Sequence, residues 1–174
     1  AKILLDQGFR EGWMQGRVRL GIFPARSENE TVIVEKRYAV PFSRQQVPDS
    51  NGLCLCLADF IASDAEDYLG VFAVTSGGQC AVKAREFEGK NDDYNSIMVK
   101  ALGDRVAESL AEWAHLQFRR ILGSREDFTL EELIEEKYEG IRPAPGYPAC
   151  PDHLLKKDIW NLLGGEAAIG ARLT

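Results

Sequence analysis

The chain has 174 residues, of which 45% are hydrophobic and 28% are charged, proportions typical of a folded globular domain. Its net charge of −6 and pI near 5.1 give no electrostatic basis for binding a nucleic-acid backbone or an anionic membrane surface. No apolar run approaches the ~20 residues that span a bilayer, and the N-terminal residues lack the pattern of a signal peptide. We therefore expect a cytoplasmic protein with no nucleic-acid and no membrane partner.

The first half of the chain indicates strands. Branched and apolar residues in Val18–Pro24 and Thr31–Glu35, joined by the polar turn Arg26–Glu30, predict a hairpin. The polar segment Arg37–Gly52 contains prolines and an Asn-Gly pair, which predicts a connecting loop with no chemistry of its own. Leu69–Val74 is a continuous apolar run and predicts a buried strand at the centre of the sheet.

The four cysteines are too few and too irregularly spaced for a disulfide framework or a metal-binding Cys-x-x-Cys pair, so we expect reduced thiols. Cys54 and Cys56 lie in the apolar segment Leu53–Ala58, which we predict to be a strand with its cysteines in the core rather than in a metal site. Cys150 has two interpretations, a small buried residue or a reactive thiol made acidic by a nearby helix N-terminus. We favour the buried residue.

From Asp92 onward the apolar residues recur at spacings of three and four, which predicts a helix over Asp92–Leu122. Asn91 or Asp92 would cap it, Gly123 would end it, and its length would be ~45 Å. Asp104, Glu108 and Glu112 follow one another at intervals of four and so form one ridge. This ridge is either a solvated face or a source of carboxylates for a bound ligand.

A shorter acidic helix is predicted over Phe128–Tyr138, because Thr129 and Glu132 form a capping box. Glu136 lies near the end of this helix, where the helix dipole disfavours a carboxylate. The side chain would therefore either pair with Arg142 or a ligand ammonium group, or be an ordinary surface glutamate.

Gly140–His153 contains four prolines, and each fixes its own φ and keeps the preceding residue out of the helical region. The loop should therefore be extended, without regular ladder hydrogen bonds. Gly146 can adopt positive φ or admit a ligand against its backbone, and Arg142 offers a planar fork for a carboxylate.

A last helix is predicted from Pro151 to Gly164-Gly165, and its N-terminus would favour an anionic ligand beside the loop. His153 would lie in the first turn of this helix, where the dipole disfavours its charged form. We interpret it as neutral and structural, with a role toward a cofactor or in proton transfer as the alternative.

Together these residues describe a site for a zwitterion that carries a polar sugar. An arginine would bind a carboxylate, carboxylates would bind an ammonium group or a diol, and Tyr147 would stack or hydrogen-bond. The sequence has no Ser-His-Asp pattern, phosphate-binding Gly-Lys-Ser/Thr loop, metal cluster or dinucleotide fingerprint. We therefore assign no catalytic residue and no metal ligand.

The stretch Arg142-Pro-Ala-Pro-Gly146-Tyr147 resembles the Arg-x-x-x-Gly-Tyr signature of the activation domain of cobalamin-dependent methionine synthase, the module that binds S-adenosylmethionine. The resemblance spans most of the chain from about Gly21 onward. Its further motifs are Leu57-Ala-Asp-Phe60, Gly70-Val-Phe-Ala-Val-Thr75, Asp92-Asp-Tyr-Asn95, Ile97-Met-Val-Lys-Ala-Leu102, Glu131-Glu-Leu-Ile134 and the helix containing Ile159-Trp160.

The resemblance implies which residues contact the ligand. They are Arg142, Pro143, Ala144, Gly146 and Tyr147, with Asp104 and Glu108 as acidic contacts. Glu136 is added as a candidate contact because of its position at a helix end before the loop. The resemblance also implies that the domain docks over the cobalamin-binding domain of the same enzyme. There, an electron from a flavodoxin or a diflavin reductase and a methyl group from S-adenosylmethionine would restore methylcobalamin from inactive cob(II)alamin. The parent enzyme makes methionine from homocysteine and methyltetrahydrofolate, and its zinc site lies in another domain.

The family's domain continues beyond the position of Thr174 and has an acidic ligand contact upstream of Ala1. We therefore expect residues 1–174 to be a single activation domain, shortened at both ends. The expected fold class is α+β, a twisted, mainly antiparallel sheet with one long helix and several shorter helices packed around it. The alternative function is a docking or scaffold domain with the same fold that does not bind the ligand.

Overall fold

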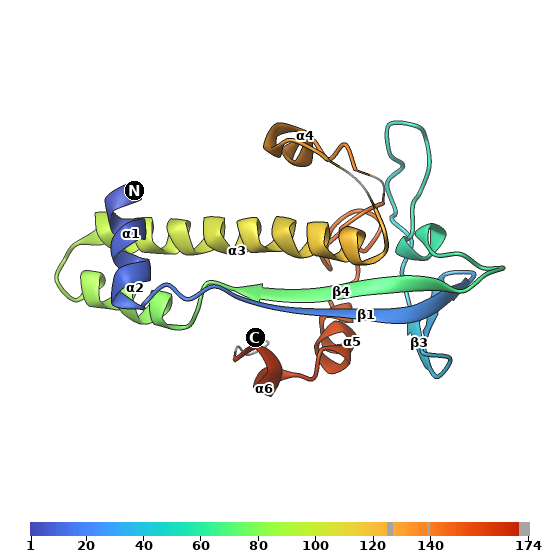
Figure 1. Ribbon diagram of the computed structural model, residues 1–174, viewed down its shortest axis with the longest axis horizontal. Helices are drawn as coiled ribbons and strands as arrows, with labels where there is room; N and C mark the ends of the chain where they lie inside the picture. Colours follow the sequence, from blue (N-terminus) through green and yellow to red (C-terminus); the bar gives the residue numbers. More distant parts are fainter. Residues whose placement is uncertain (125–126, 139, 171–174) are drawn as a thin grey trace. The chain divides into compact units, whose positions relative to one another are not determined.

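The computed structural model describes residues 1–124, 127–138 and 140–170 (Figure 1). It divides into two compact units. The first comprises Ala1–Leu20, Phe72–Gln117 and the residues from Leu163, and the second comprises Gly21–Val71 and Phe118–Leu162. The elements form a four-stranded sheet and several helices, one of them long, so the predicted α+β class is confirmed.

The sheet has the strand order β3-β2-β1-β4. Its strands are β1 (Arg17–Glu28), β2 (Thr31–Val34), β3 (Tyr38–Pro41) and β4 (Asp67–Thr75). The β1–β2 and β2–β3 pairs are antiparallel. The predicted hairpin is confirmed, but β1 continues to Glu28, so only Asn29 and Glu30 remain to make the turn.

Two expectations about the strands were wrong. β3 lies inside the segment predicted to be a loop, and Pro41 is compatible with it because β3 is an edge strand, where a missing N–H costs little. β4 lies at the other edge of the sheet rather than at its centre. Its apolar run reflects packing on both faces, since Leu69 and Val71 are buried and Gly70, which alternates with them, lies against the ring of Phe118.

The predicted strand over Leu53–Ala58 was also wrong. The chain there is irregular and leads into a short 3-10 helix, η1 (Leu57–Phe60). The carboxylate of Asp59 accepts the N–H of Cys56 (2.9 Å), which curls the backbone into this turn. Cys56 is nevertheless fully buried, as the core interpretation requires, whereas Cys54 is half-buried.

In the first unit, α1 (Lys2–Glu11) and α2 (Gln79–Glu88) lie beside the first turns of α3 (Asp93–Ile121) (Figure 1). The sequence analysis did not predict α1 or α2. Their core is a cluster of five buried side chains, which are Trp13, Met14, Cys80, Ala84 and Val99. The thiol of Cys80 donates to the carbonyl of Trp13 (3.3 Å), which joins the segment after α1 to α2.

The long helix was predicted to within one residue at each end. The carboxylate of Asp92 accepts the N–H of Asn95 (3.1 Å) at its start. At its end, Gly123 has φ 92° and the N–H of Ser124 donates to the carbonyl of Arg119 (2.9 Å). No helix among the described residues is long and apolar enough to cross a membrane.

The remaining helices are shorter than predicted. In α4 (Leu130–Ile134) the Thr129–Glu132 capping box is confirmed, but the helix ends early because Glu136 takes φ 54°. The last part of the chain has α5 (Leu155–Leu162) and α6 (Glu166–Ile169). The predicted start at Pro151 was wrong, since the carboxylate of Asp152 accepts the N–H of Leu154 (2.8 Å) and forms a turn before α5 begins.

The tight packing of β4 predicts that Gly70→Ala lowers the free energy of unfolding by about 1–3 kcal/mol. A Cβ added at Gly70 would lie 2.4 Å from Cε2 of Phe118, so the ring has to move. Gly78→Ala is the matched control, because the space around Gly78 is open and its φ of −62° suits alanine. Urea unfolding of both variants measures the difference, and equal midpoints would contradict the packing.

Candidate functional site

The proline-rich loop of the second unit consists of two consecutive tight turns, so the expectation of an extended loop was wrong. In the first, the N–H of Tyr147 donates to the carbonyl of Ala144 (3.0 Å), and Gly146 has φ 108°. In the second, the N–H of Cys150 donates to the carbonyl of Tyr147 (3.0 Å), and Ala149 has φ 64°. A proline followed by a residue with positive φ is the pattern of a type II turn, and each turn has it.

Gly146 has a positive φ, which is one of the two alternatives that the sequence left open, and its bare Cα faces a side chain of the same chain. A Cβ added there would lie 2.2 Å from Cε1 of His153. His153 itself lies in the turn before α5 and not in the first turn of the helix, so the predicted location was wrong. Its contact with Gly146 supports the structural interpretation of this histidine.

The ligand-binding candidates of the loop are all close together in sequence and in one unit. Arg142 is half-buried and precedes the first turn, where Pro143 restricts it to an extended backbone. Ala144 is exposed, and Tyr147, between the two turns, is 64% exposed. The loop therefore presents the aromatic ring of Tyr147 from a backbone with little freedom, with Arg142 in the same segment.

The acidic candidates lie on other elements. Asp104 and Glu108 are exposed residues of α3 in the first unit, and the carboxylate of Glu108 pairs with Arg105 (2.7 Å). Glu136 is exposed just beyond the end of α4, and among the described residues no ion pair joins its carboxylate to Arg142. The expected anion site at the last helix is also altered, because the Asp152 carboxylate already accepts the N–H group of Leu154.

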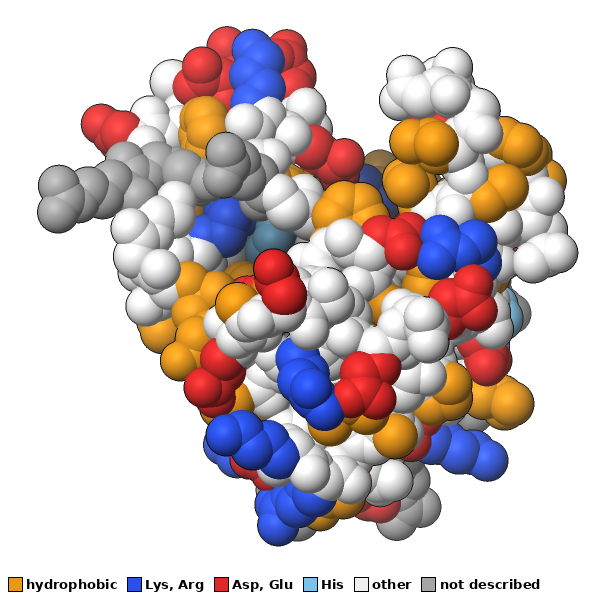
Figure 2. All heavy atoms as spheres, turned by 90° about the vertical axis from the view of Figure 1, so that its right-hand side faces the viewer, with side chains coloured by type: hydrophobic (Ala, Val, Ile, Leu, Met, Phe, Trp, Pro, Cys, Tyr) orange, Lys and Arg blue, Asp and Glu red, His pale blue; other side chains and the backbone are white. Residues whose placement is uncertain are grey.

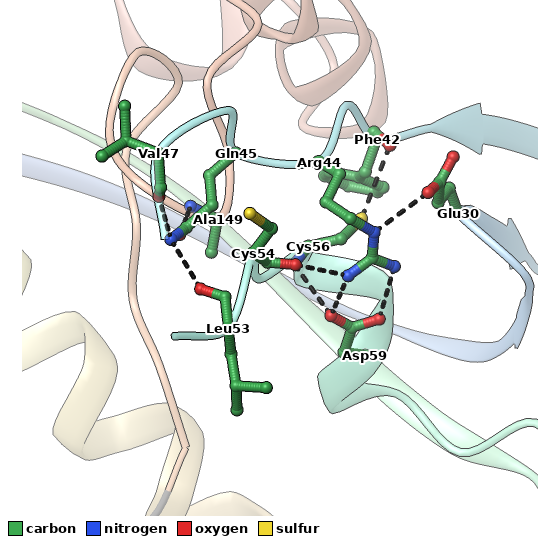
Figure 3. Close-up of polar contacts among 10 residues, drawn as sticks. All are labelled: Glu30, Phe42, Arg44, Gln45, Val47, Leu53, Cys54, Cys56, Asp59 and Ala149. Carbon is green, nitrogen blue, oxygen red and sulfur yellow. Dashed lines mark hydrogen bonds and ion pairs between the residues drawn. The ribbon is translucent and has the colours of Figure 1, made fainter. Parts of the chain in front are cut away.

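Gln45 connects the proline-rich loop to a segment that the sequence analysis considered inert (Figure 3). Its Oε1 accepts the N–H of Ala149 (3.2 Å), and its Nε2 donates to the carbonyls of Val47 (2.8 Å) and Leu53 (3.2 Å). From the other side, the N–H of Leu57 donates to the carbonyl of Ala149 (2.8 Å). Hydrogen bonds thus hold the strained residue Ala149 through both its N–H and its C=O.

Arg44 stabilises the same region. Its guanidinium binds both oxygens of Asp59 (2.7 and 2.9 Å), the carbonyl of Cys54 (2.7 Å) and the carboxylate of Glu30 (3.0 Å) (Figure 3). The hydrogen bonds from Arg44 lower the pKa of the Asp59 carboxyl and raise the pKa of Arg44 itself. The loop predicted to have no chemistry of its own therefore has a structural role, which the sequence analysis did not predict. The only sequence signal for the Arg44 contacts was the Leu57-Ala-Asp-Phe60 motif, which contains their partner Asp59.

Comparison with known proteins identifies the family. Residues 1–174 match the family model described as "Vitamin B12 dependent methionine synthase, activation domain". The chain belongs to this family. A solved structure described as the crystal structure of the MetH reactivation domain bound to AdoHcy is 41% identical, with a TM-score of 0.90. The alignment covers 99% of this chain and 57% of that one, so the chain spans little more than half of this relative.

The proline-rich loop of this activation domain contains one cysteine, Cys150. Cys150 is buried, and burial, helped by Cys56 and Asp152, raises its pKa to about 11. Burial also raises the pKa of Cys56. Both thiols are therefore protonated near neutral pH, which agrees with the buried-residue interpretation of Cys150. Among the residues that the structure describes, no three His, Cys, Asp or Glu side chains cluster as metal ligands would.

The double turn predicts that Gly146→Ala lowers the free energy of unfolding by about 1–3 kcal/mol, because alanine is strained at this φ. The added methyl group also displaces the ring of His153, so Gly146→Ala combined with His153→Ala should recover the steric part only. Ala144→Gly is the control, with a cost below about 1 kcal/mol. Guanidinium unfolding measures all of them, and equal costs for the two single changes would contradict the turn geometry.

Proposed function

We propose that the chain binds S-adenosylmethionine through the loop from Arg142 to Tyr147 and supports the reductive methylation of cob(II)alamin in a cobalamin-dependent methionine synthase. The proposal rests on one observation. The chain is 41% identical, at a TM-score of 0.90, to a reactivation domain bound to AdoHcy. AdoHcy, S-adenosylhomocysteine, is what remains of S-adenosylmethionine once its methyl group has been transferred. A relative that holds this product supports the methyl donor as the ligand of this chain.

The loop suits such a ligand chemically. The half-buried guanidinium of Arg142 can bind the amino-acid carboxylate, and the exposed ring of Tyr147 can stack or hydrogen-bond. Pro143, Ala144 and Gly146 bring the backbone against the ligand. Carboxylates at Glu108, Asp104 and Glu136 would bind the ligand ammonium group or its ribose hydroxyls. The ligand supplies the activated methyl group, so the residues of the chain need only bind and orient it.

The partners follow from the family. We propose that the domain acts on cobalamin held by a neighbouring domain of the same cytoplasmic enzyme, with a flavodoxin or a diflavin reductase as the electron donor. Zinc belongs to another domain of the parent enzyme. Figure 2 shows acidic and basic side chains interspersed over the face that it draws, with hydrophobic side chains between them. A mixed surface of this kind favours protein partners over a polyanion.

The central test is the affinity of Arg142→Ala for S-adenosylmethionine, measured by isothermal titration. We expect a loss of about 1.5–3 kcal/mol, or about 10- to 150-fold, because a charge-assisted contact with the carboxylate disappears. Arg142→Lys should restore only part of it, since an ammonium group cannot form the planar fork. If Arg142→Ala binds as tightly as the parent, the loop is not the carboxylate-binding part of the site. A folded parent chain that binds neither S-adenosylmethionine nor S-adenosylhomocysteine would favour the docking or scaffold domain.

Glu108 provides a second test. Glu108→Gln should weaken binding about tenfold, because it removes the charge that faces the ligand. Its thermal stability should barely change, because an exposed ion pair with Arg105 contributes little. Arg105→Gln is the matched control, since it breaks the same ion pair but leaves the carboxylate in place.

In the full-length enzyme, Glu108→Gln should slow reductive reactivation and leave the methionine-forming turnover of active enzyme unchanged. If Arg105→Gln weakened binding as much as Glu108→Gln, or if the two activities fell together, Glu108 would be a surface residue and not a ligand contact.

A further inference from the structure

Gln45 is buried, with 8% of its surface exposed, and both the oxygen and the nitrogen of its side-chain amide form hydrogen bonds. The oxygen accepts from the N–H of Ala149, and the nitrogen donates to the carbonyls of Val47 and Leu53. A buried amide with every contact directed at backbone groups fixes the two segments that it joins, because each group would lose its partner if either segment moved. Gln45 thus ties the segment between β3 and η1 to the proline-rich loop (Figure 3).

Ala149 needs this support more than other residues of the loop. It has φ 64°, in the left-handed region where a Cβ is unfavourable, and it is the second central residue of its turn. The N–H of Gly146 donates to the carbonyl of Cys150 (2.8 Å), so the first turn depends on the position of the second. Any relaxation of Ala149 would therefore move Tyr147, which lies between the two turns.

We propose that Gln45 is a positioning residue for the bound S-adenosyl ligand. It holds Ala149 in the left-handed conformation and thereby fixes Tyr147 and the backbone that follows Arg142. The proposal rests on the proposed ligand function and adds to it a residue that does not touch the ligand. The competing explanation is that Gln45 orders only the segment between β3 and η1, through its hydrogen bonds to Val47 and Leu53, and has no effect on the ligand. Val47 in that segment is 76% exposed.

The experiment combines Gln45→Met with Ala149→Gly. Methionine keeps the size of glutamine but removes its hydrogen bonds, so we expect about tenfold weaker binding of S-adenosylmethionine in an isothermal titration. Amide exchange at Gly146 and Cys150, followed by NMR, should become faster. Glycine at position 149 has no strain at positive φ, so Ala149→Gly should restore most of the affinity and of the amide protection in the Gln45→Met background. In the parent background it should change the affinity less than threefold.

Gln46→Met is the matched control. Its amide is exposed and, within the described part of the chain, donates to the carbonyl of Arg44 alone (2.9 Å), so its loss should alter neither the affinity nor the exchange. Gln45→Asn is the second variant, used if Gln45→Met does not fold. It keeps an uncharged amide but is one methylene group shorter, which lengthens the 3.2 Å contact with the N–H of Ala149, so it should also weaken binding, and Ala149→Gly should restore the affinity.

The results separate the two proposals. Faster exchange with unchanged affinity, or a loss of affinity that Ala149→Gly does not restore, would overturn the role of Gln45 in positioning. A loss in Gln45→Asn that Ala149→Gly does not restore would overturn it as well. If the parent chain binds neither S-adenosylmethionine nor S-adenosylhomocysteine, the proposed function fails, and the positioning role fails with it. The exchange data then still show whether Gln45 holds the loop.

Discussion

The left-handed backbone at Gly146 and Ala149 is the constraint on which the candidate site depends. These two residues close consecutive turns, and the peptide at Ala149 is fixed by Gln45 through its N–H and by Leu57 through its C=O. Prolines at the first central position of each turn reduce the freedom of the unfolded chain, so less entropy is lost when the loop orders. A loop that is already ordered also loses less entropy when a ligand binds. The hydrogen bonds that hold Ala149 at its unfavourable φ therefore also fix the position of Tyr147.

The sequence predicted the features that depend on neighbouring residues. The capping box at Thr129, the long helix from Asp93 to Ile121 and the positive φ of Gly146 were correct, because each follows from side chains within one or two turns. The predictions that failed depended on distant partners or on competing local contacts. β3 forms because β2 offers a pairing edge, and α5 begins late because Asp152 binds a backbone N–H that would otherwise belong to the first turn.

The candidate site was partly predictable for the same reason. The motif from Arg142 to Tyr147 identified the loop and the family, and the family is confirmed over residues 1–174. Nothing local indicated Arg44 or Gln45, because polar residues in a segment with prolines are usually solvated. Their roles appear only when the chain folds and brings Ala149, 104 positions away in sequence, to the amide of Gln45. The residues that support a binding loop can therefore be far less evident in sequence than those that touch the ligand.

The chemistry of the loop fits a domain that presents a methyl donor without reacting with it. A sulfonium methyl group alkylates thiolates readily, so an acidic cysteine beside the ligand would be a competing acceptor. Burial raises the pKa of Cys150 to about 11, which keeps its thiol protonated and poorly nucleophilic at neutral pH. The same turn that orders Tyr147 places Cys150 in the interior, since its N–H closes the turn and its carbonyl accepts the N–H of Gly146. In the proposed function, one backbone arrangement therefore orients the ligand and also keeps the thiol of Cys150 in the interior.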